Sequence, residues 1–241
     1  MSGHYLLLWL EAPLQSWGAD SKFGRRDTLP FPTKSGILGL ICAALGASGE
    51  QRELLAEMAP LGQTVISYIR TYGGGDAAKK KAERETLLRD FHMVGSGYDS
   101  SDSWQILHIP KTADGGKAVG GGTKMTFRYY LQDAKFAAIV EVPPQKAAAF
   151  AAALQNPVYD IYLGRKNCVP TDFVFQGVFD NEETAFAKAL EVASEKKLLE
   201  DFRVVPGEDA GGENYTINDV PVQFGQIKKY RDRRVTLIQH E

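Results

Sequence analysis

Residues 14–46 read LQSWGADSKFGRRDTLPFPTKSGILGLICAALG, and this stretch joins a polar turn, a basic loop and an apolar helix. Thr33 or Ser35 can cap the helix and Gly46 ends it. A helix start presents unpaired backbone N–H groups and a partial positive charge. Because Arg25 and Arg26 lie just upstream, we expect this segment to bind a phosphate of a polyanion. The alternative is that Pro-Thr-Lys-Ser-Gly only caps a core helix, a role that requires no nearby cations.

The patterns outside this stretch predict four strands and a second long helix. Apolar or β-branched runs predict the strands, and an alanine-rich run after two prolines predicts the helix. The strands are expected at residues 5–11, 64–72, 135–142 and 173–179, and the helices at 33–45 and 145–156. Strand, helix, strand, strand, helix, strand is the split βαβ pattern of ferredoxin-like α+β folds. RNA-recognition domains share this topology.

Two further regions accompany this core pattern. Residues 91–127 are rich in glycine and serine and too long for an ordinary connection, so we expect an excursion from the core. Residues 1–180 are expected to form one domain that carries the excursion. Residues 181–241 are expected to form a small β-rich C-terminal extension packed on the same core. The elements expected within this extension are an acidic helix at 182–193 and strands at 222–227 and 235–239.

The composition is that of a soluble protein whose charge is unevenly distributed. The chain has 241 residues, 44% of them hydrophobic and 24% charged, and its formal net charge is −2. Between Asp180 and Asp219, eleven acidic and four basic residues give a net of −7, so the rest of the chain carries +5. A basic body can bind an anion while an acidic segment docks elsewhere.

The cysteines and the first apolar run favour a cytoplasmic location. Only Cys42 and Cys168 are present, so no disulfide framework is expected. The run at residues 5–11 is too short for a signal peptide or a membrane span and lacks a basic segment before it. We therefore expect a cytoplasmic protein without a membrane partner.

The sequence contains no motif for a metal, a cofactor or a hydrolytic triad. The histidines and cysteines lack partners at ligand spacing, so no metal site is expected. The glycine runs match no nucleotide-binding loop and no nucleophile elbow occurs, so no cofactor is expected. An enzyme that acts on a small-molecule phosphate would need a paired acid and base, and the sequence shows no such pair. Acid–base cleavage of RNA stays open, because the excursion holds four suitable side chains: His92, Tyr98, His108 and Lys111.

Two other features could contribute to a polyanion site. Gly164, Arg165 and Lys166 form a basic turn in which glycine would let an RNA backbone approach closely. The alternative is a solvated turn. Trp17 could stack on a base, as aromatic side chains do in single-strand binders, or it could pack in the core.

Five segments of the chain, taken in order, resemble one protein family. They are PLQSWG, RRDTLPFPTKSGILGLICAALG, LRDFHMVG, TFRYYLQDAKF and YLGRKNCVP, and they span most of residues 5–179. The family they resemble is the CRISPR-associated Cascade subunit CasD, the fifth-numbered Cas family of the repeat-associated RAMP superfamily, in its subtype I-E form. The resemblance implies a ferredoxin-like, RNA-recognition-like (RAMP) domain with a long β-hairpin thumb, which corresponds to the excursion at 91–127.

The resemblance also implies a function in antiviral defence. Members of this family bind the 5′ handle of the crRNA and cap the backbone filament next to the large subunit. The implied partners are the crRNA, the backbone subunit, the large subunit and, through the complex, target DNA. In subtype I-E the subunit is non-catalytic; the alternative is the metal-independent endoribonuclease of subtype I-C, which processes pre-crRNA. The positions that match the family's RNA contacts are Gln15, Trp17, Arg25, Arg26, Thr33, Lys34, Ser35, Gly36, Arg89, His92, Lys124, Arg128, Arg165 and Lys166.

Overall fold

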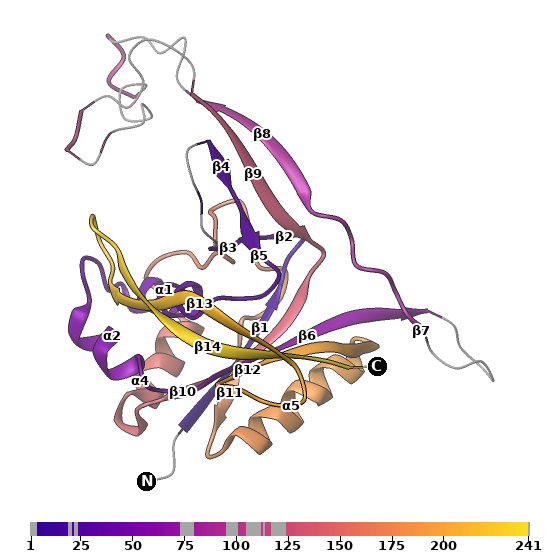
Figure 1. The fold of residues 1–241 in the computed structure, drawn as a ribbon. Coiled ribbons are helices and arrows are strands. Elements are labelled where there is room, and N and C mark those ends of the chain that lie inside the picture. The colour runs from indigo at the N-terminus through magenta and orange to yellow at the C-terminus, as the bar shows by residue number, and fades with distance from the viewer. Residues whose placement is uncertain are drawn as a thin grey trace.

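The computed structural model describes residues 4–18, 21, 24–72, 80–94, 101–104, 112, 114–116 and 124–240. In these residues the protein is a mixed fold of helices and strands, mostly strands, around a central antiparallel sheet (Figure 1). The strands of this sheet follow the order β11-β1-β10-β6-β12-β14-β13, and β7 (Lys80–Lys81) pairs with the end of β6.

Four adjacent strands of this sheet are the ones that the sequence pattern predicts. They are β11 (Phe175–Phe179), β1 (His4–Glu11), β10 (Lys135–Val142) and β6 (Gln63–Tyr72). In chain order they are the fourth, first, third and second strands of the predicted pattern. The strands predicted at 5–11, 64–72 and 135–142 are confirmed to within one residue at each end. The strand predicted at 173–179 is β11, which begins two residues later than expected.

Strand β1 is apolar at successive positions because both of its faces are covered. Leu6, Leu8 and Leu10 belong to one hydrophobic cluster, and Leu7 and Trp9 belong to a second. Successive side chains of a strand point to opposite faces of the sheet. The alternating membership therefore places one cluster on each face, and the sheet lies between two layers of apolar side chains.

Helices α1 and α4 cover one face of the sheet, and α5 covers the other. Helix α1 (Lys34–Leu45) begins after the N-cap Thr33 and ends at Gly46, whose φ is 70°, so the predicted helix is confirmed. Helix α4 (Pro144–Gln155) packs against α1 and also matches its prediction. Helix α5 (Glu182–Glu195) places small alanine side chains against the second cluster.

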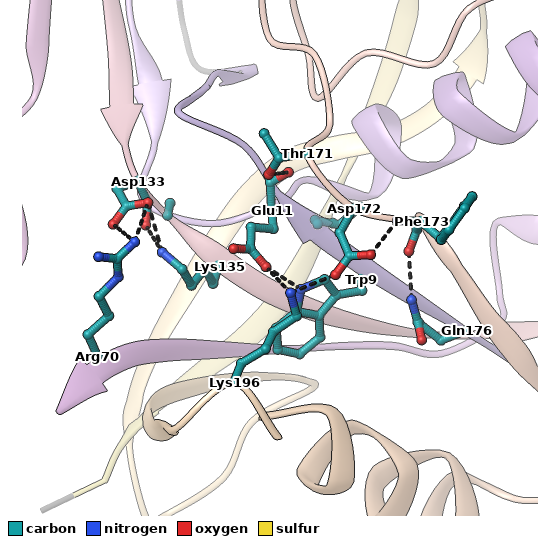
Figure 2. Close-up of polar contacts among 12 residues, drawn as sticks. Trp9, Glu11, Arg70, Asp133, Lys135, Thr171, Asp172, Phe173, Gln176 and Lys196 are labelled. Carbon is teal, nitrogen blue, oxygen red and sulfur yellow. Dashed lines mark hydrogen bonds and ion pairs between the residues drawn. The ribbon is translucent and has the colours of Figure 1, made fainter. Parts of the chain in front are cut away.

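Lys196 fastens the end of α5 to the sheet, as Figure 2 shows. Its Nζ lies 2.9 Å from the Glu11 carboxylate on β1 and 2.6 Å from the Asp172 carboxylate just before β11. The ammonium also lies 5.8 Å from the ring centre of Trp9, whose Nε1 donates to Glu11 at 2.9 Å. RNA-recognition domains stack bases on an open sheet face. Because α5 covers the corresponding aromatic face here, any RNA must bind elsewhere.

The C-terminal strands continue the central sheet and then fold back over the helices. β12 (Leu198–Pro206) pairs with β6, and β14 (Lys229–Gln239) pairs with β12. β13 (Glu213–Gln223) pairs with β14 to form what we call the C-terminal hairpin, which lies over α1 and α2 (Arg52–Met58; Figure 1). Of the strand predicted at 222–227, only residues 222–223 are extended, as the end of β13, because the chain turns after Gln223 to connect the two arms.

A second hairpin, formed by β8 (Leu88–Val94) and β9 (Lys124–Gln132), projects from the body of the protein (Figure 1). Its ladder runs from Leu88 opposite Tyr130 to Val94 opposite Lys124. Apart from 101–104, 112 and 114–116, residues 95–123 of the expected excursion lie outside the described residues. Short strands tie the base of this hairpin to the sequence around Trp17: β2 (Leu14–Gln15) and β4 (Arg25–Arg26) pair with β9, and β3 (Trp17–Gly18) pairs with β5 (Thr28–Leu29).

Candidate nucleic-acid interface

An open groove of about 660 Å³ runs beside the start of α1, and we call it the α1 groove. Ser35 and Gly36 of α1 form part of its floor. The segment after α4, with Tyr159 and Tyr162, forms one wall. The tip of the C-terminal hairpin adds Lys228 and other side chains. With Arg26 and other residues that precede α1, the groove collects residues from four separate parts of the sequence.

A second groove of about 710 Å³ lies beneath the β8–β9 hairpin, and we call it the β8–β9 groove. Among the described residues that line it, the cations are Arg26, Arg128, Arg165 and Lys166, and one carboxylate is present, that of Asp90. The α1 groove and the β8–β9 groove share Arg26, Gly164 and Arg165. A chain of negative charge could therefore pass from one groove to the other along a continuous basic border.

The β8–β9 hairpin has one polar and one apolar face. Asp90 lies opposite Arg128, and His92 lies opposite Thr126, so these side chains share the face that lines the β8–β9 groove. The other face carries apolar residues that are largely exposed. These are Phe91, Met93, Met125 and Phe127, and the rings of Phe91 and Phe127 lie 5.4 Å apart. The polar face is therefore the one that joins the basic grooves.

Gly164 holds the basic turn against the β2–β3 segment. Its φ is 103°, and a Cβ added there would lie 1.7 Å from the carbonyl oxygen of Ser16. The Ser16 amide donates to the Leu163 carbonyl at 3.1 Å. Glycine is therefore needed here because a protein backbone approaches it closely, not because RNA does, and this changes the reason that the sequence suggested.

The Arg165 guanidinium makes several contacts within the protein. Nη1 donates to the Tyr129 carbonyl at 3.0 Å, and Nη2 donates to the Arg26 carbonyl at 2.9 Å. The same guanidinium lies 4.6 Å from the centre of the Tyr130 ring. Arg165 thus joins β4 to β9 at the base of the β8–β9 hairpin. It brings positive charge to both grooves, but its main role is to position the base of the β8–β9 hairpin.

Arg25 and Arg26 lie next to each other on β4 but in different surroundings. Arg25 is exposed, and its Nε donates to both carboxylate oxygens of Asp27, at 2.8 and 2.7 Å. Its guanidinium also lies 4.8 Å from the ring centre of Tyr129. Arg26 lines both grooves. Of the two predicted arginines, Arg26 is therefore the one whose side chain is better placed to contact a ligand in both grooves.

The start of α1 is not an open anion site, so the expected phosphate cradle is corrected. The Lys34 amide donates to the carboxylate of Asp219 at 2.7 Å, and the Gly36 amide donates to the Thr33 hydroxyl at 3.1 Å. Arg233 holds the same Asp219 carboxylate through hydrogen bonds of 2.7 and 2.9 Å. The C-terminal hairpin therefore supplies the anion at this helix start.

The Lys34 side chain also points away from both grooves. It is 3% exposed, and its Nζ donates to the carbonyls of Ala59 at 2.9 Å and Leu61 at 2.6 Å, just after α2. Burial, followed by the nearby Arg233 charge, lowers the pKa of Lys34 to about 8. Lys34 and the fully buried Thr33 are thus part of the packing and not of an RNA surface.

Gln15 and Trp17 support the groove from below. Gln15 is fully buried, and its Nε2 donates to the carbonyls of Leu10 and Ala134 at 3.0 and 2.7 Å. Trp17 is 1% exposed, donates to the Gln15 side chain at 3.0 Å and packs under Gly36. These two predicted contacts are corrected, because neither side chain is accessible for hydrogen bonding or stacking.

The remaining predicted residues lie along the β8–β9 hairpin and the basic turn. His92, Arg128 and Lys166 line the β8–β9 groove. Arg89 lies on the apolar face, 5.5 Å from the ring centre of Phe127. Lys124 is the first residue of β9, and its side chain lies outside the described part. The structure thus brings together Arg26, Arg128, Arg165, Lys166 and His92 around one groove.

Several residues of the α1 groove were not predicted. They are Tyr159, Tyr162, Phe224, Lys228 and Tyr230. The basic cluster after residue 227 is visible in the sequence, but nothing there indicates that its hairpin folds back over α1. Among the described residues, no group of three or more histidine, cysteine or acidic side chains could hold a metal ion. No helix in that part of the chain is long and apolar enough to cross a membrane.

Of the side chains considered for acid–base cleavage, only His92 can be placed. It lies in the β8–β9 groove beside Asp90 and Arg128. Tyr98, His108 and Lys111 lie outside the described residues. A cleavage site that pairs His92 with one of them therefore has no geometry to support it.

Comparisons with known proteins agree with the motifs and the fold. The model of the family described as CRISPR-associated protein (Cas_Cas5) matches residues 5–236, so the chain belongs to the Cas5 family of CRISPR-associated proteins. The chain is similar to the CRISPR system Cascade subunit CasD of Escherichia coli (strain K12). The two are 31% identical over 178 residues, which cover 72% of this chain and 70% of that relative.

Solved structures give the same result. A chain of a CRISPR RNA-guided surveillance complex is 26% identical, with a TM-score of 0.66, over 98% of this chain and 90% of that one. A chain from the crystal structure of a Cas protein is 27% identical, with a TM-score of 0.59, over 98% and 94% of the two chains. The similarity in fold therefore includes the C-terminal strands as well as the segments that carry the motifs.

Proposed function

We propose that this protein is an RNA-binding subunit of a type I-E Cascade surveillance complex in CRISPR defence. It holds the 5′ handle of the crRNA in the α1 groove and the β8–β9 groove. The observation that carries this proposal is the continuity of the two grooves through Arg26, Gly164 and Arg165. Similarity to the Cascade subunit CasD and to a chain of an RNA-guided surveillance complex supports the choice of ligand.

The proposal includes the type of domain. The order β11-β1-β10-β6 is that of a ferredoxin-like sheet, which supports the proposal that residues 1–180 form a RAMP domain and residues 181–241 its C-terminal extension. The β8–β9 hairpin would form the base of the family's thumb. The subunit would cap the backbone filament next to the large subunit, and would meet target DNA only through the complex. Assembly of this complex would take place in the cytoplasm.

The α1 and β8–β9 grooves suit binding better than cleavage. Single-stranded RNA is held by cations that follow its backbone and by aromatic rings that stack on bases. The α1 groove supplies tyrosines and the β8–β9 groove supplies a cluster of cations. Cleavage would need a base for the 2′-OH and an acid for the leaving oxygen. We therefore propose a non-catalytic subunit.

Charge reversal in the β8–β9 groove tests the proposed function. We expect the double variant Arg128→Glu and Lys166→Glu to lower affinity for labelled crRNA at least about tenfold. Each lost phosphate contact should also reduce the slope of log K against log salt by about 0.7. Lys188→Glu is the matched control, because this lysine lies on α5, which covers the other face of the sheet from α1. Unchanged affinity and slope in the double variant would contradict the proposal.

A cleavage assay decides between binding and the endoribonuclease alternative. Purified protein is incubated with CRISPR repeat RNA in EDTA, and the products are separated on a denaturing gel. We expect bound but intact RNA. Specific cleavage that disappears in a His92→Ala variant would instead establish the metal-independent endoribonuclease.

A further inference from the structure

The C-terminal hairpin closes one side of the α1 groove. Lys228 and Tyr230 of this hairpin line the same groove as Arg26, Tyr162 and Arg165. The hairpin and the basic turn therefore line one groove, although the two segments are far apart in the sequence. This position turns a surface depression beside α1 into a groove with two walls.

The hairpin is fixed in this position both in its middle and at its tip. In the middle, Asp219 accepts a hydrogen bond from the Lys34 amide and is held by Arg233, whose side chain is 12% exposed. At the tip, the Phe224 amide donates to the Glu50 carbonyl at 2.9 Å. Gln223 adds hydrogen bonds to the Glu50 side chain and the Ile227 carbonyl, at 3.2 and 2.8 Å. A fixed wall can present side chains at constant positions.

The side chains near the tip are available, whereas two arginines in the middle of β14 are used within the protein. Arg233 pairs with Asp219, and Arg234 pairs with Glu208. Among the described residues, no acidic side chain lies within ion-pair distance of the exposed Lys228. Tyr230 is 38% exposed and lies in the groove. The tip thus combines a cation without an internal role and an aromatic ring, the two groups that single-strand binders use.

We propose that the C-terminal hairpin is a second RNA-binding wall, in which Lys228 contacts a phosphate and Tyr230 stacks on a base or ribose. This inference rests on the proposed function, because it concerns the same RNA in the α1 groove. It adds residues from outside every segment that carries the family resemblance. It also gives a reason for the joint between Asp219 and the start of α1, which holds the wall at a constant distance from the basic turn.

Substitutions at the tip test the inference in the full-length protein, with crRNA labelled at its 3′ end as the probe. We expect Tyr230→Ala and Lys228→Glu each to weaken binding by about tenfold, and Tyr230→Phe to retain most of the affinity because it keeps the ring. We expect Lys228→Glu to reduce the salt slope as well. Tyr215→Ala is the matched control, since Tyr215 is a similarly exposed tyrosine, 42% against 38%, at the other end of the same hairpin. Thermal unfolding of each variant checks that the fold is intact.

The outcomes separate this inference from the proposed function. Loss of binding both in the tip variants and in the Arg128 and Lys166 double variant supports the inference. Loss in the double variant alone overturns the hairpin wall and leaves the proposed function standing. Unchanged binding in all of these variants overturns both. A Tyr215→Ala variant that weakens binding as much as Tyr230→Ala would overturn the assignment of the contact to the tip.

Discussion

Replacing Arg165 with lysine separates the charge of this side chain from its shape. The arginine donates to two backbone carbonyls, those of Tyr129 at 3.0 Å and Arg26 at 2.9 Å, while it lies 4.6 Å from the Tyr130 ring centre. Lysine keeps the positive charge but has one compact ammonium in place of a planar fork. It can satisfy one of the carbonyls and cannot lie flat on the ring at the same time.

The expected cost follows from these lost contacts. A hydrogen bond from a charged group contributes about 1.5–3 kcal/mol, and a cation–π contact contributes about 0.5–2 kcal/mol. Since Arg165 is half-buried, the lower end of each range applies. We therefore expect Arg165→Lys to lower the free energy of unfolding by about 2 kcal/mol.

Urea unfolding measures this change, with linear extrapolation to water. Lys166→Gln is the matched control, because it removes a charge from the neighbouring exposed residue, and we expect a change within about 0.5 kcal/mol. Affinity of Arg165→Lys for crRNA should fall while its salt slope stays unchanged, because the charge is retained and the base of the β8–β9 hairpin is loosened. Wild-type stability together with wild-type affinity in Arg165→Lys would refute the positioning role and leave Arg165 as an ordinary cation.

Three further changes test the packing around the grooves, all by urea unfolding. Gly164→Ala would bring a Cβ to 1.7 Å from a backbone oxygen, so we expect the free energy of unfolding to fall by at least about 2 kcal/mol. Gly49→Ala is the control, also at positive φ but in open space, and should lower it by about 1 kcal/mol. Equal losses in the two variants would contradict the close backbone contact at Gly164. Asp219→Ala breaks a buried ion pair and removes the carboxylate that accepts from the Lys34 amide, so we expect a loss of about 3 kcal/mol, and an unchanged urea midpoint would contradict the proposed contact between the C-terminal hairpin and α1. Because the pKa of Lys34 is lowered from 10.5 to about 8, the unfolded chain holds a proton between these pH values that the folded chain has released, and stability rises with pH. The advantage of wild type over Lys34→Met should therefore grow by up to about 3 kcal/mol across that window, and a constant difference would contradict it.

The elements of the core could be predicted because their signals are local. The apolar run in β1 reflects burial on both faces of a central strand. Helix α1 carries its own cap, Thr33, and its own stop, Gly46. Each of these signals lies within the element that it defines, so no tertiary information was needed.

The candidate site could be predicted only in part, because its errors depend on distant contacts. Whether the start of α1 is open depends on Asp219, which is 185 residues further along the chain than Lys34. Whether Gln15 is accessible depends on Ala134, which is 119 residues away. The cations of the basic turn, Arg165 and Lys166, could be identified from the sequence itself, whereas Arg128 of the β8–β9 hairpin was identified only through the family resemblance. Lys228 and Tyr230 were missed because only the folded hairpin brings them to the groove.

The occupied helix start changes how an RNA backbone can be held in the α1 groove. A phosphate at the Lys34 amide would have to displace a carboxylate that Arg233 binds with two hydrogen bonds and that is 4% exposed. Removing one partner of such a buried pair is strongly unfavourable. If RNA binds in this groove as we propose, side chains along the groove hold it, and its position depends on how the walls are fixed. We therefore expect substitutions of Arg165, at one wall, and of Asp219, behind the other, to weaken RNA binding more than the low exposure of these side chains would suggest.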